Sequence, residues 1–150
     1  MGLVAGPQEA WVALLGTKEH ATGTFGRLDA AGNAAWFTLS TPQARDSGLL
    51  HLGFPATRGR TLWLVSSSII NASLQDALIR IEFDPTFSRV ISEQTASLPT
   101  QLCKAHRVLP FGDGAFATEL TTATLAYVGT KDAWNARVTS APDSGHDEPD

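Results

Sequence analysis

Short segments in which apolar and polar residues alternate run along most of the chain. Residues 24–29 and 77–84 alternate with a period of two, which is the pattern of a β-strand with one buried face. Apolar segments at residues 35–39, 87–91 and 106–111 follow them, and turns containing Gly, Pro, Asn or Asp lie between. No segment keeps a helical period between capping residues. The pattern therefore predicts an all-β protein.

Similar segments recur at a nearly constant spacing. In three places a polar, Gly-bearing turn precedes an aromatic residue that opens an apolar strand; these residues, Trp11, Trp63 and Phe116, lie 52 and 53 residues apart. Arg27 and Arg80, in the two alternating strands, are also 53 residues apart. A fixed spacing of this length is typical of repeat proteins. We expect the three aromatic side chains to pack between neighbouring repeats.

Each repeat holds four short strands, the fourth of which, at residues 48–54 and 106–111, leads into the next aromatic turn. This rhythm predicts β-propeller-type blades of four antiparallel strands over residues 1–129, between two and three blades in all, and hence a partial propeller. A β-sandwich also has short strands at regular spacing, but it has no reason to repeat its sequence at a fixed step. An incomplete propeller leaves sheet edges open, so we expect self-association or a larger propeller context.

The formal net charge of −4 is unevenly distributed. Residues 1–130 carry 9 Lys and Arg against 10 Asp and Glu, whereas residues 131–150 carry 2 against 5. We expect residues 130–150 to form a disordered acidic tail. The nearly neutral remainder has no basic stripe that a phosphate backbone would follow, which argues against nucleic-acid binding.

Cys103 is the single cysteine, so an intrachain disulfide is impossible, which fits a reducing compartment. We expect this thiol to be buried and inert. The apolar residues 1–16 lack the basic segment of a signal peptide, and no apolar run reaches the length of a membrane span. The expectation is a cytoplasmic protein without a membrane partner.

Three segments carry a resemblance to a known family: Phe-Gly-Arg-Leu at residues 25–28, Trp-Phe-Thr-Leu-Ser-Thr-Pro at residues 36–42 and Phe-Ala-Thr-Glu at residues 116–119. Over about residues 3–128 the chain resembles β-propellers of the streptogramin B lyase (virginiamycin B lyase) type, whose blades carry Ile-Gly-Arg-Ile and Trp-Phe-Thr-Glu elements. The resemblance implies a lyase that opens a cyclic depsipeptide by elimination. It also implies a divalent cation, typically Mg²⁺, and a histidine base.

The resemblance assigns two candidate catalytic residues. His106 takes the place of the histidine in the family's Pro-His-Gly/Ala-Ile strand, and Glu119 ends the Trp-Phe-Thr-Glu-like segment. A neutral imidazole suits a general base near pH 7 and a carboxylate suits Mg²⁺, so Glu119 is also the candidate metal ligand. The chain departs from the family pattern at Ala105 and Arg107. The alternatives are a strand-end histidine that hydrogen-bonds a carbonyl and a solvated carboxylate.

Structural interpretations are favoured for the other polar residues. We expect His51 to be a satisfied or surface histidine and His20 to be an exposed loop residue. Residues 66–68, all Ser, are not a nucleophile elbow, because no Gly-x-Ser-x-Gly occurs. Asp-Gly at residues 113–114 predicts a turn rather than a calcium loop. No phosphate-binding Gly-rich loop and no zinc-type His/Cys spacing is present.

These patterns leave three functional hypotheses. The first is a propeller that binds a small organic ligand at its channel mouth, with metal-assisted lyase chemistry by His106 and Glu119. The second is a non-catalytic protein-interaction propeller module. The third is a fragment of a longer propeller protein without independent activity.

Overall fold

The computed structural model describes residues 2–5, 9–13, 24–40, 50–52, 56–70, 73–98, 105–119, 124–129 and 135–140. Within these ranges the chain forms thirteen strands and no helix, so the all-β prediction is confirmed. No helix in this part of the chain is therefore suited to crossing a membrane.

The strands form three antiparallel sheets, each built from strands that follow one another in the chain. The N-terminal sheet contains β1 (Gly2–Ala5), β2 (Glu9–Ala13), β3 (Thr24–Asp29) and β4 (Ala34–Thr38). The central sheet contains β5 (Leu50–Leu52), β6 (Ala56–Arg58), β7 (Thr61–Ile70), β8 (Ser73–Phe83) and β9 (Val90–Ser97), and both β5 and β6 pair with β7. The C-terminal sheet contains β10 (Ala105–Phe111), β11 (Gly114–Glu119), β12 (Thr124–Gly129) and β13 (Asn135–Ser140).

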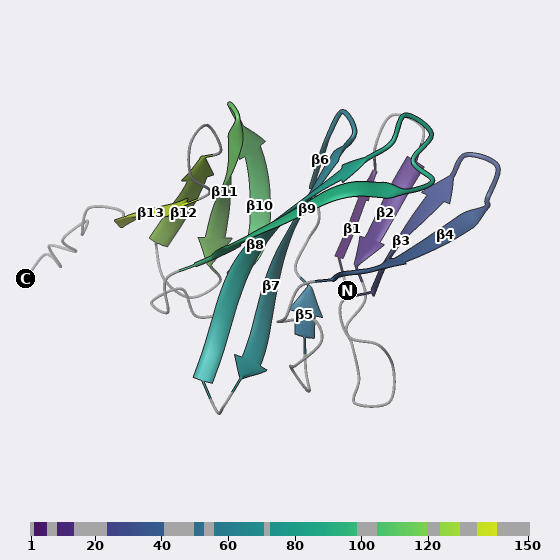
Figure 1. The fold of residues 1–150 in the computed structure, drawn as a ribbon. Helices are drawn as coiled ribbons and strands as arrows, with labels where there is room; N and C mark the ends of the chain where they lie inside the picture. The colour runs from purple at the N-terminus through teal and green to yellow at the C-terminus, as the bar shows by residue number, and fades with distance from the viewer. Residues whose placement is uncertain are drawn as a thin grey trace, which may run out of the picture.

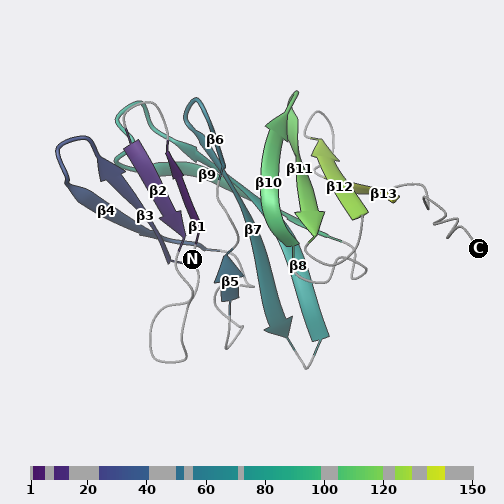
Figure 2. The same ribbon diagram turned by 180° about the vertical axis from the view of Figure 1, so that it is seen from behind.

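The central sheet lies between the other two (Figures 1 and 2). Its strand β7 serves both interfaces because successive side chains point to opposite faces. Leu62 and Leu64 pack toward the N-terminal sheet, whereas Trp63 and Val65 pack toward the C-terminal sheet. Burial on both faces explains why this strand is a continuous apolar run rather than an alternating one.

The core between the N-terminal and central sheets is aromatic. Trp11, Phe25 and Phe83 are almost completely buried there, and Phe37 and Phe87 pack against them. The ring centroids of Trp11 and Phe83 are 4.8 Å apart, and those of Phe25 and Phe37 are 5.4 Å apart and stacked. We call this cluster the aromatic core; large rings supply most of its buried apolar area.

The core between the central and C-terminal sheets consists mainly of small side chains. It combines Trp63 and a few aliphatic residues with four buried alanines, Ala96, Ala115, Ala117 and Ala126. We call it the small-residue core. Strands β11 and β12 also approach closely, since a Cβ on Gly114 would lie 1.9 Å from the carbonyl oxygen of Val128.

Two of the three repeat-spaced aromatic residues pack between sheets as expected. Trp11 is 1% exposed in the aromatic core and Trp63 is 4% exposed in the small-residue core. Phe116 differs, because it faces away from the central sheet. Its ring lies 5.6 Å from that of Phe111 and 4.9 Å from that of Tyr127, measured between centroids.

The structure corrects three predicted boundaries. The strand expected at residues 87–91 begins only at Val90, because residues 85–89 form a closed turn. Of the strand expected at residues 48–54, the described part is β5, at residues 50–52, and residues 56–58, where the sequence predicted no strand, form β6. Residues 135–140, assigned by sequence to the disordered tail, form β13 and pair along their whole length with β12, so the expected tail of residues 130–150 is wrong there.

Candidate functional site

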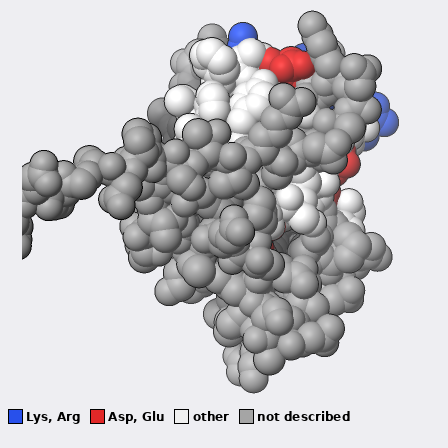
Figure 3. Space-filling model, turned by 90° about the vertical axis from the view of Figure 1, so that its left-hand side faces the viewer, with Lys and Arg blue, Asp and Glu red and all other residues white. Residues whose placement is uncertain are grey.

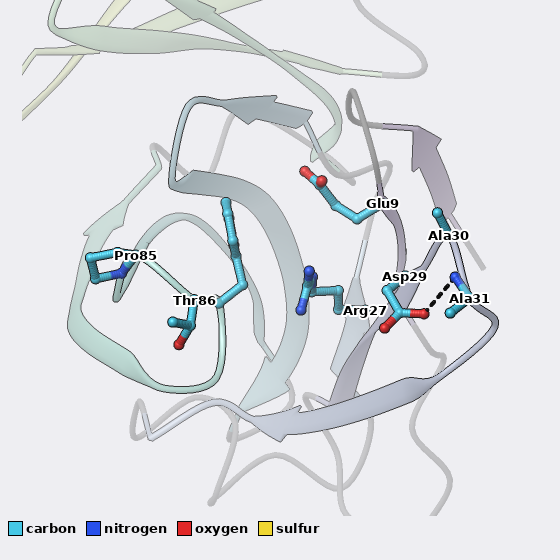
Figure 4. Close-up of a pocket in the computed structure, with 8 residues that line it drawn as sticks. Glu9, Arg27, Asp29, Ala30, Ala31, Pro85 and Thr86 are labelled. Atoms are coloured by element: carbon cyan, nitrogen blue, oxygen red, sulfur yellow. Dashed lines mark hydrogen bonds between the residues drawn. The ribbon is translucent and has the colours of Figure 1, made fainter.

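A hollow of about 400 Å³ opens between the N-terminal sheet and the β8–β9 turn of the central sheet (Figure 4). Its lining combines two carboxylates, one guanidinium, an aromatic ring and small turn residues: Glu9, Arg27, Asp29, Ala30, Ala31, Pro85, Thr86 and Phe87. The volume lies in the range of sites for small organic molecules. It sits at one end of the aromatic core, where the sheets separate.

Arg27 is the central side chain of this hollow. It lies directly across the sheet from Trp11 on one side and Ala35 on the other. From β3 it extends toward the β8–β9 turn (Figure 4), where its guanidinium carbon stands 5.1 Å from the centroid of the Phe87 ring. This is the geometry of a cation–π contact. The guanidinium forms no hydrogen bond with any residue that the structure describes, and its Nε is buried without a partner.

Asp29 faces the hollow but uses its carboxylate to hold the β3–β4 turn. Its Oδ1 accepts hydrogen bonds from the backbone N–H groups of Ala31 and Asn33, both at 2.9 Å, and its Oδ2 accepts one from the Asn33 amide at 3.0 Å. The Asn33 side-chain bond, followed by these backbone bonds and the charge of Arg27, lowers the pKa of Asp29 below its ordinary value. Asp29 is therefore ionised and already occupied.

The opposite wall is the β8–β9 turn, which Asp84 closes. Its Oδ1 accepts the backbone N–H groups of Ser88 at 2.8 Å and Arg89 at 3.1 Å, and its Oδ2 accepts the hydroxyl of Thr86 at 2.7 Å. The Thr86 hydroxyl above all, with these backbone donors, lowers the pKa of Asp84 to about 2. The closed turn holds Phe87 at a positive φ of 55°. Non-glycine residues rarely adopt this conformation, and such strain concentrates at binding sites.

Glu9 supplies the second acidic group. It opens β2 and lies directly opposite Asp29 in the sheet, where two like charges repel each other. Its carboxylate points into the hollow beside Arg27 (Figure 4), yet it makes neither an ion pair nor a hydrogen bond with a described residue. Among the described residues, the hollow thus offers one guanidinium and one carboxylate that no other side chain or backbone group engages in a hydrogen bond.

In the central sheet, Arg80 holds the position that corresponds to Arg27, and there protein groups accept hydrogen bonds from the guanidinium. Arg80 lies across from Trp63 and Gln94 as Arg27 lies across from Trp11 and Ala35. Its guanidinium donates to Glu82 in an ion pair and to the Gln94 side-chain oxygen at 2.9 Å, and lies 5.7 Å from the Trp63 ring centroid. The Nε of each arginine is buried without a hydrogen-bond partner in the described part of the chain. The terminal nitrogens differ, because those of Arg80 have two acceptors and those of Arg27 have none among the described residues.

The candidate catalytic residues assigned from the sequence, His106 and Glu119, do not line this hollow. They lie in the C-terminal sheet, where β10 begins and β11 ends. Ala105 pairs with Glu119 and Arg107 with Thr118, so His106 is the extra residue of a β-bulge. Bulges often re-aim side chains beside active sites. The backbone thus brings His106 and Glu119 to neighbouring positions. His106 is half-buried, and the Glu119 side chain is outside the described residues, so a shared site of the two stays a prediction.

The other His and Cys residues considered from the sequence supply no further described side chain beside His106. His51 lies in β5 with a side chain outside the described part, and His20 and Cys103 lie outside it altogether. In the described ranges no three His, Cys, Asp or Glu residues come together as metal ligands would. Mg²⁺ takes an octahedral set of oxygens, usually with one or two carboxylates. The described residues do not assemble such a set around His106.

Sequence reasoning missed the hollow because Arg27 was interpreted only as part of a blade motif. The repeat spacing alone gave no signal, because only the strand register of the structure sets Ala35 opposite Arg27 where Gln94 stands opposite Arg80. The chain matches no protein-family model, no curated protein and no solved structure. The resemblance to streptogramin B lyase propellers accordingly stays a prediction, and the site is argued from its own chemistry.

Proposed function

We propose that the three sheets are β-propeller-type blades and that the chain is a binding module for a small organic molecule. Support for the blades comes from the connectivity. The neighbouring strands of each sheet are consecutive in the chain, except that β5 and β6 both pair with β7. A β-sandwich of the immunoglobulin type instead uses Greek-key connections between its sheets. The near-constant spacing of Trp11, Trp63 and Phe116 agrees with the same interpretation.

The ligand site of this proposal is the hollow at Arg27, not the channel mouth expected from the sequence. The observation that carries it is the contrast between two arginines at equivalent positions, because Arg80 has two protein acceptors and Arg27 has none among the described residues. A half-buried guanidinium without an acceptor is costly. A ligand carboxylate removes that cost through a charge-assisted, bidentate contact.

The Glu9 carboxylate, the second charged group of the hollow available to a ligand, indicates which class of small molecule would fit. The free carboxylate of Glu9 is suited to an ammonium group, while the Asp29 carboxylate is occupied by its own turn. The faces of Phe87 and Pro85 offer apolar contact. The hollow therefore fits a small zwitterion, a molecule with a carboxylate for Arg27, an ammonium for Glu9 and a modest apolar part.

Three related probes test this proposal by calorimetric titration: leucine, 4-methylpentanoate, which lacks the ammonium, and 3-methylbutylamine, which lacks the carboxylate. Leucine should bind most tightly. Arg27→Gln should weaken leucine to the level of the amine, and Glu9→Gln should weaken it to the level of the acid. Arg89→Gln, an exposed arginine on the same turn, is the matched control and should bind as the unchanged chain does. Equal binding of all three probes, or no effect of Arg27→Gln, would refute the proposal.

A second function is supported by the β-bulge at His106. The bulge sets a histidine beside the end of β11, where Glu119 lies, and a general base needs such a neighbour to orient it. This supports a lyase in which His106 removes a proton from the substrate. Its test is elimination of a cyclic depsipeptide with and without Mg²⁺. The activity should disappear in His106→Ala; activity that is absent from the start, or that survives this substitution, rejects the lyase.

A further inference from the structure

Both outer faces of the three-sheet stack expose large apolar side chains. On the N-terminal sheet, the face turned away from the aromatic core carries Ala10, Val12, Gly26, Leu28, Ala34 and Trp36, which line a shallow hollow of about 140 Å³. Leu28 is 46% exposed and Trp36 57% exposed. The ring of Trp36 lies flat against Gly26, where a Cβ would come within 2.5 Å of it. We call this surface the N-face.

The opposite end of the stack presents an aromatic surface. The outer face of the C-terminal sheet carries Leu109, 62% exposed, Phe111, 61% exposed, and the packed pair Phe116 and Tyr127. We call it the C-face. Viewed from this side, uncharged described side chains gather at the upper end of the molecule (Figure 3). Exposed large apolar residues that are adjacent to one another indicate an interaction surface.

The register of the sheets shows what normally covers a surface like the N-face. Aligned on Trp11, Trp63 and Phe116, the N-face residues Ala10, Val12, Gly26 and Leu28 correspond to Leu62, Leu64, Ile79 and Ile81 in the central sheet and to Ala115, Ala117, Ala126 and Val128 in the C-terminal sheet. All eight corresponding residues are at most 1% exposed. In each case the preceding sheet covers them.

The same alignment shows what the C-face normally covers. Trp11 and its face pack onto the central sheet, and Trp63 and its face pack onto the C-terminal sheet. Phe116 holds the third such position, and none of the sheets that the structure describes packs on its face. In the other two sheets, the face that corresponds to the N-face is covered by the preceding sheet. In the first two sheets, the face that corresponds to the C-face packs on the following sheet. The N-face and the C-face both belong to one chain.

We propose that a second copy of this chain covers both surfaces, the C-face of each copy packing on the N-face of the other. Such a contact is heterologous, and it either closes into a ring or continues as an open filament. Two copies bring six sheets together, within the range of four to eight blades that closed propellers use. The inference is a closed head-to-tail dimer, and it is independent of any ligand at Arg27.

Light scattering after size-exclusion chromatography of the full chain tests this directly. The expected mass is that of two copies of 15.9 kDa. Leu28→Glu on the N-face and Leu109→Glu on the C-face should each weaken the dimer about tenfold or more, because each sets a charge into a buried contact. Ile91→Glu is the matched control, since Ile91 is 52% exposed but lies on neither face, and it should remain dimeric. Thermal unfolding followed by circular dichroism establishes that each variant is folded.

Mixing the two variants distinguishes the geometry. In a head-to-tail dimer, Leu28→Glu and Leu109→Glu chains together regain one unaltered interface, so the mixture should contain dimers that neither variant forms alone. If two copies instead pair like face to like face, one of the two variants stays dimeric by itself, and the proposal is wrong. A monomeric unchanged chain, or a ladder of growing assemblies, likewise overturns it.

Discussion

The aromatic core and the small-residue core join the same central sheet to its two neighbours by different means. Rings fill the aromatic core, and at its edge Arg27 faces a hollow rather than protein acceptors. The small-residue core is made of alanines and aliphatic side chains, and on its face Arg80 is held by Glu82 and Gln94. The aromatic core borders a hollow beside Phe87, whereas buried alanines line the contact between the central and C-terminal sheets. The difference teaches that equivalent positions of a repeat diverge where packing leaves space.

Removing the largest ring should show the strongest effect. Trp11 is 1% exposed and touches four aromatic rings, so Trp11→Ala should cost about 4 kcal/mol in the free energy of unfolding. Ile91→Ala trims an exposed side chain that lies on neither outer face and should cost about 0.5 kcal/mol or less. Urea unfolding measures both. Similar losses for the two variants would contradict the aromatic core.

Adding a single methyl group at Gly114 tests how closely β11 and β12 approach each other in the C-terminal sheet. Gly114→Ala brings a Cβ against the backbone oxygen of Val128, which cannot rotate away, and should cost about 2 to 3 kcal/mol. Gly129→Ala is the matched control, because its Cβ would meet the Tyr127 ring at 3.1 Å and a side chain can move. Equal thermal stability of the two variants would show that β11 and β12 are less tightly apposed.

The two arginines should respond unequally to the same change. Arg80→Gln leaves the partly exposed Glu82 carboxylate without its ion pair, and we expect a loss of about 1 kcal/mol after allowance for solvent screening. Arg27→Gln breaks no hydrogen bond to a described residue and should change stability by about half that or less. Chemical unfolding of both variants at low and high salt measures the difference. A larger loss at Arg27 would mean that its guanidinium has acceptors in the folded protein.

The smallest expected effect is a loss of folding stability at low pH, when the Asp84 carboxylate becomes protonated. The folded protein lowers the pKa of Asp84 from 3.8 to about 2, so its ionised form stabilises the fold fully above about pH 4. That contribution is lost as the pH falls from about 4 to about 2. Asp84→Asn should flatten this part of the stability profile measured by thermal unfolding. A steeper acid dependence in Asp84→Asn would contradict the hydrogen-bonded turn.

Local patterns predicted the regular parts of this fold well. The alternation at residues 24–29 and the turn after it, where Gly32 adopts a φ of 86°, depend on near neighbours only. The sequence pattern did not predict where β9 begins, because the Asp84 carboxylate accepts hydrogen bonds that hold residues 85–89 in a turn. The candidate site was missed for a different reason. A free guanidinium is a property of what surrounds Arg27 in space, and its sequence motif is the same whether acceptors are present or not.

The most direct test of the account compares Arg27 and Arg80 in one experiment. The guanidinium Nη–H signals of both arginines are followed by nuclear magnetic resonance while leucine is added, and Arg27→Gln and Arg80→Gln assign them. The account predicts that the Arg27 signal moves in a saturable way and that the Arg80 signal stays in place, because Arg80 already donates to Glu82 and Gln94. Signals that both remain fixed, or that move together, would contradict a ligand site at Arg27.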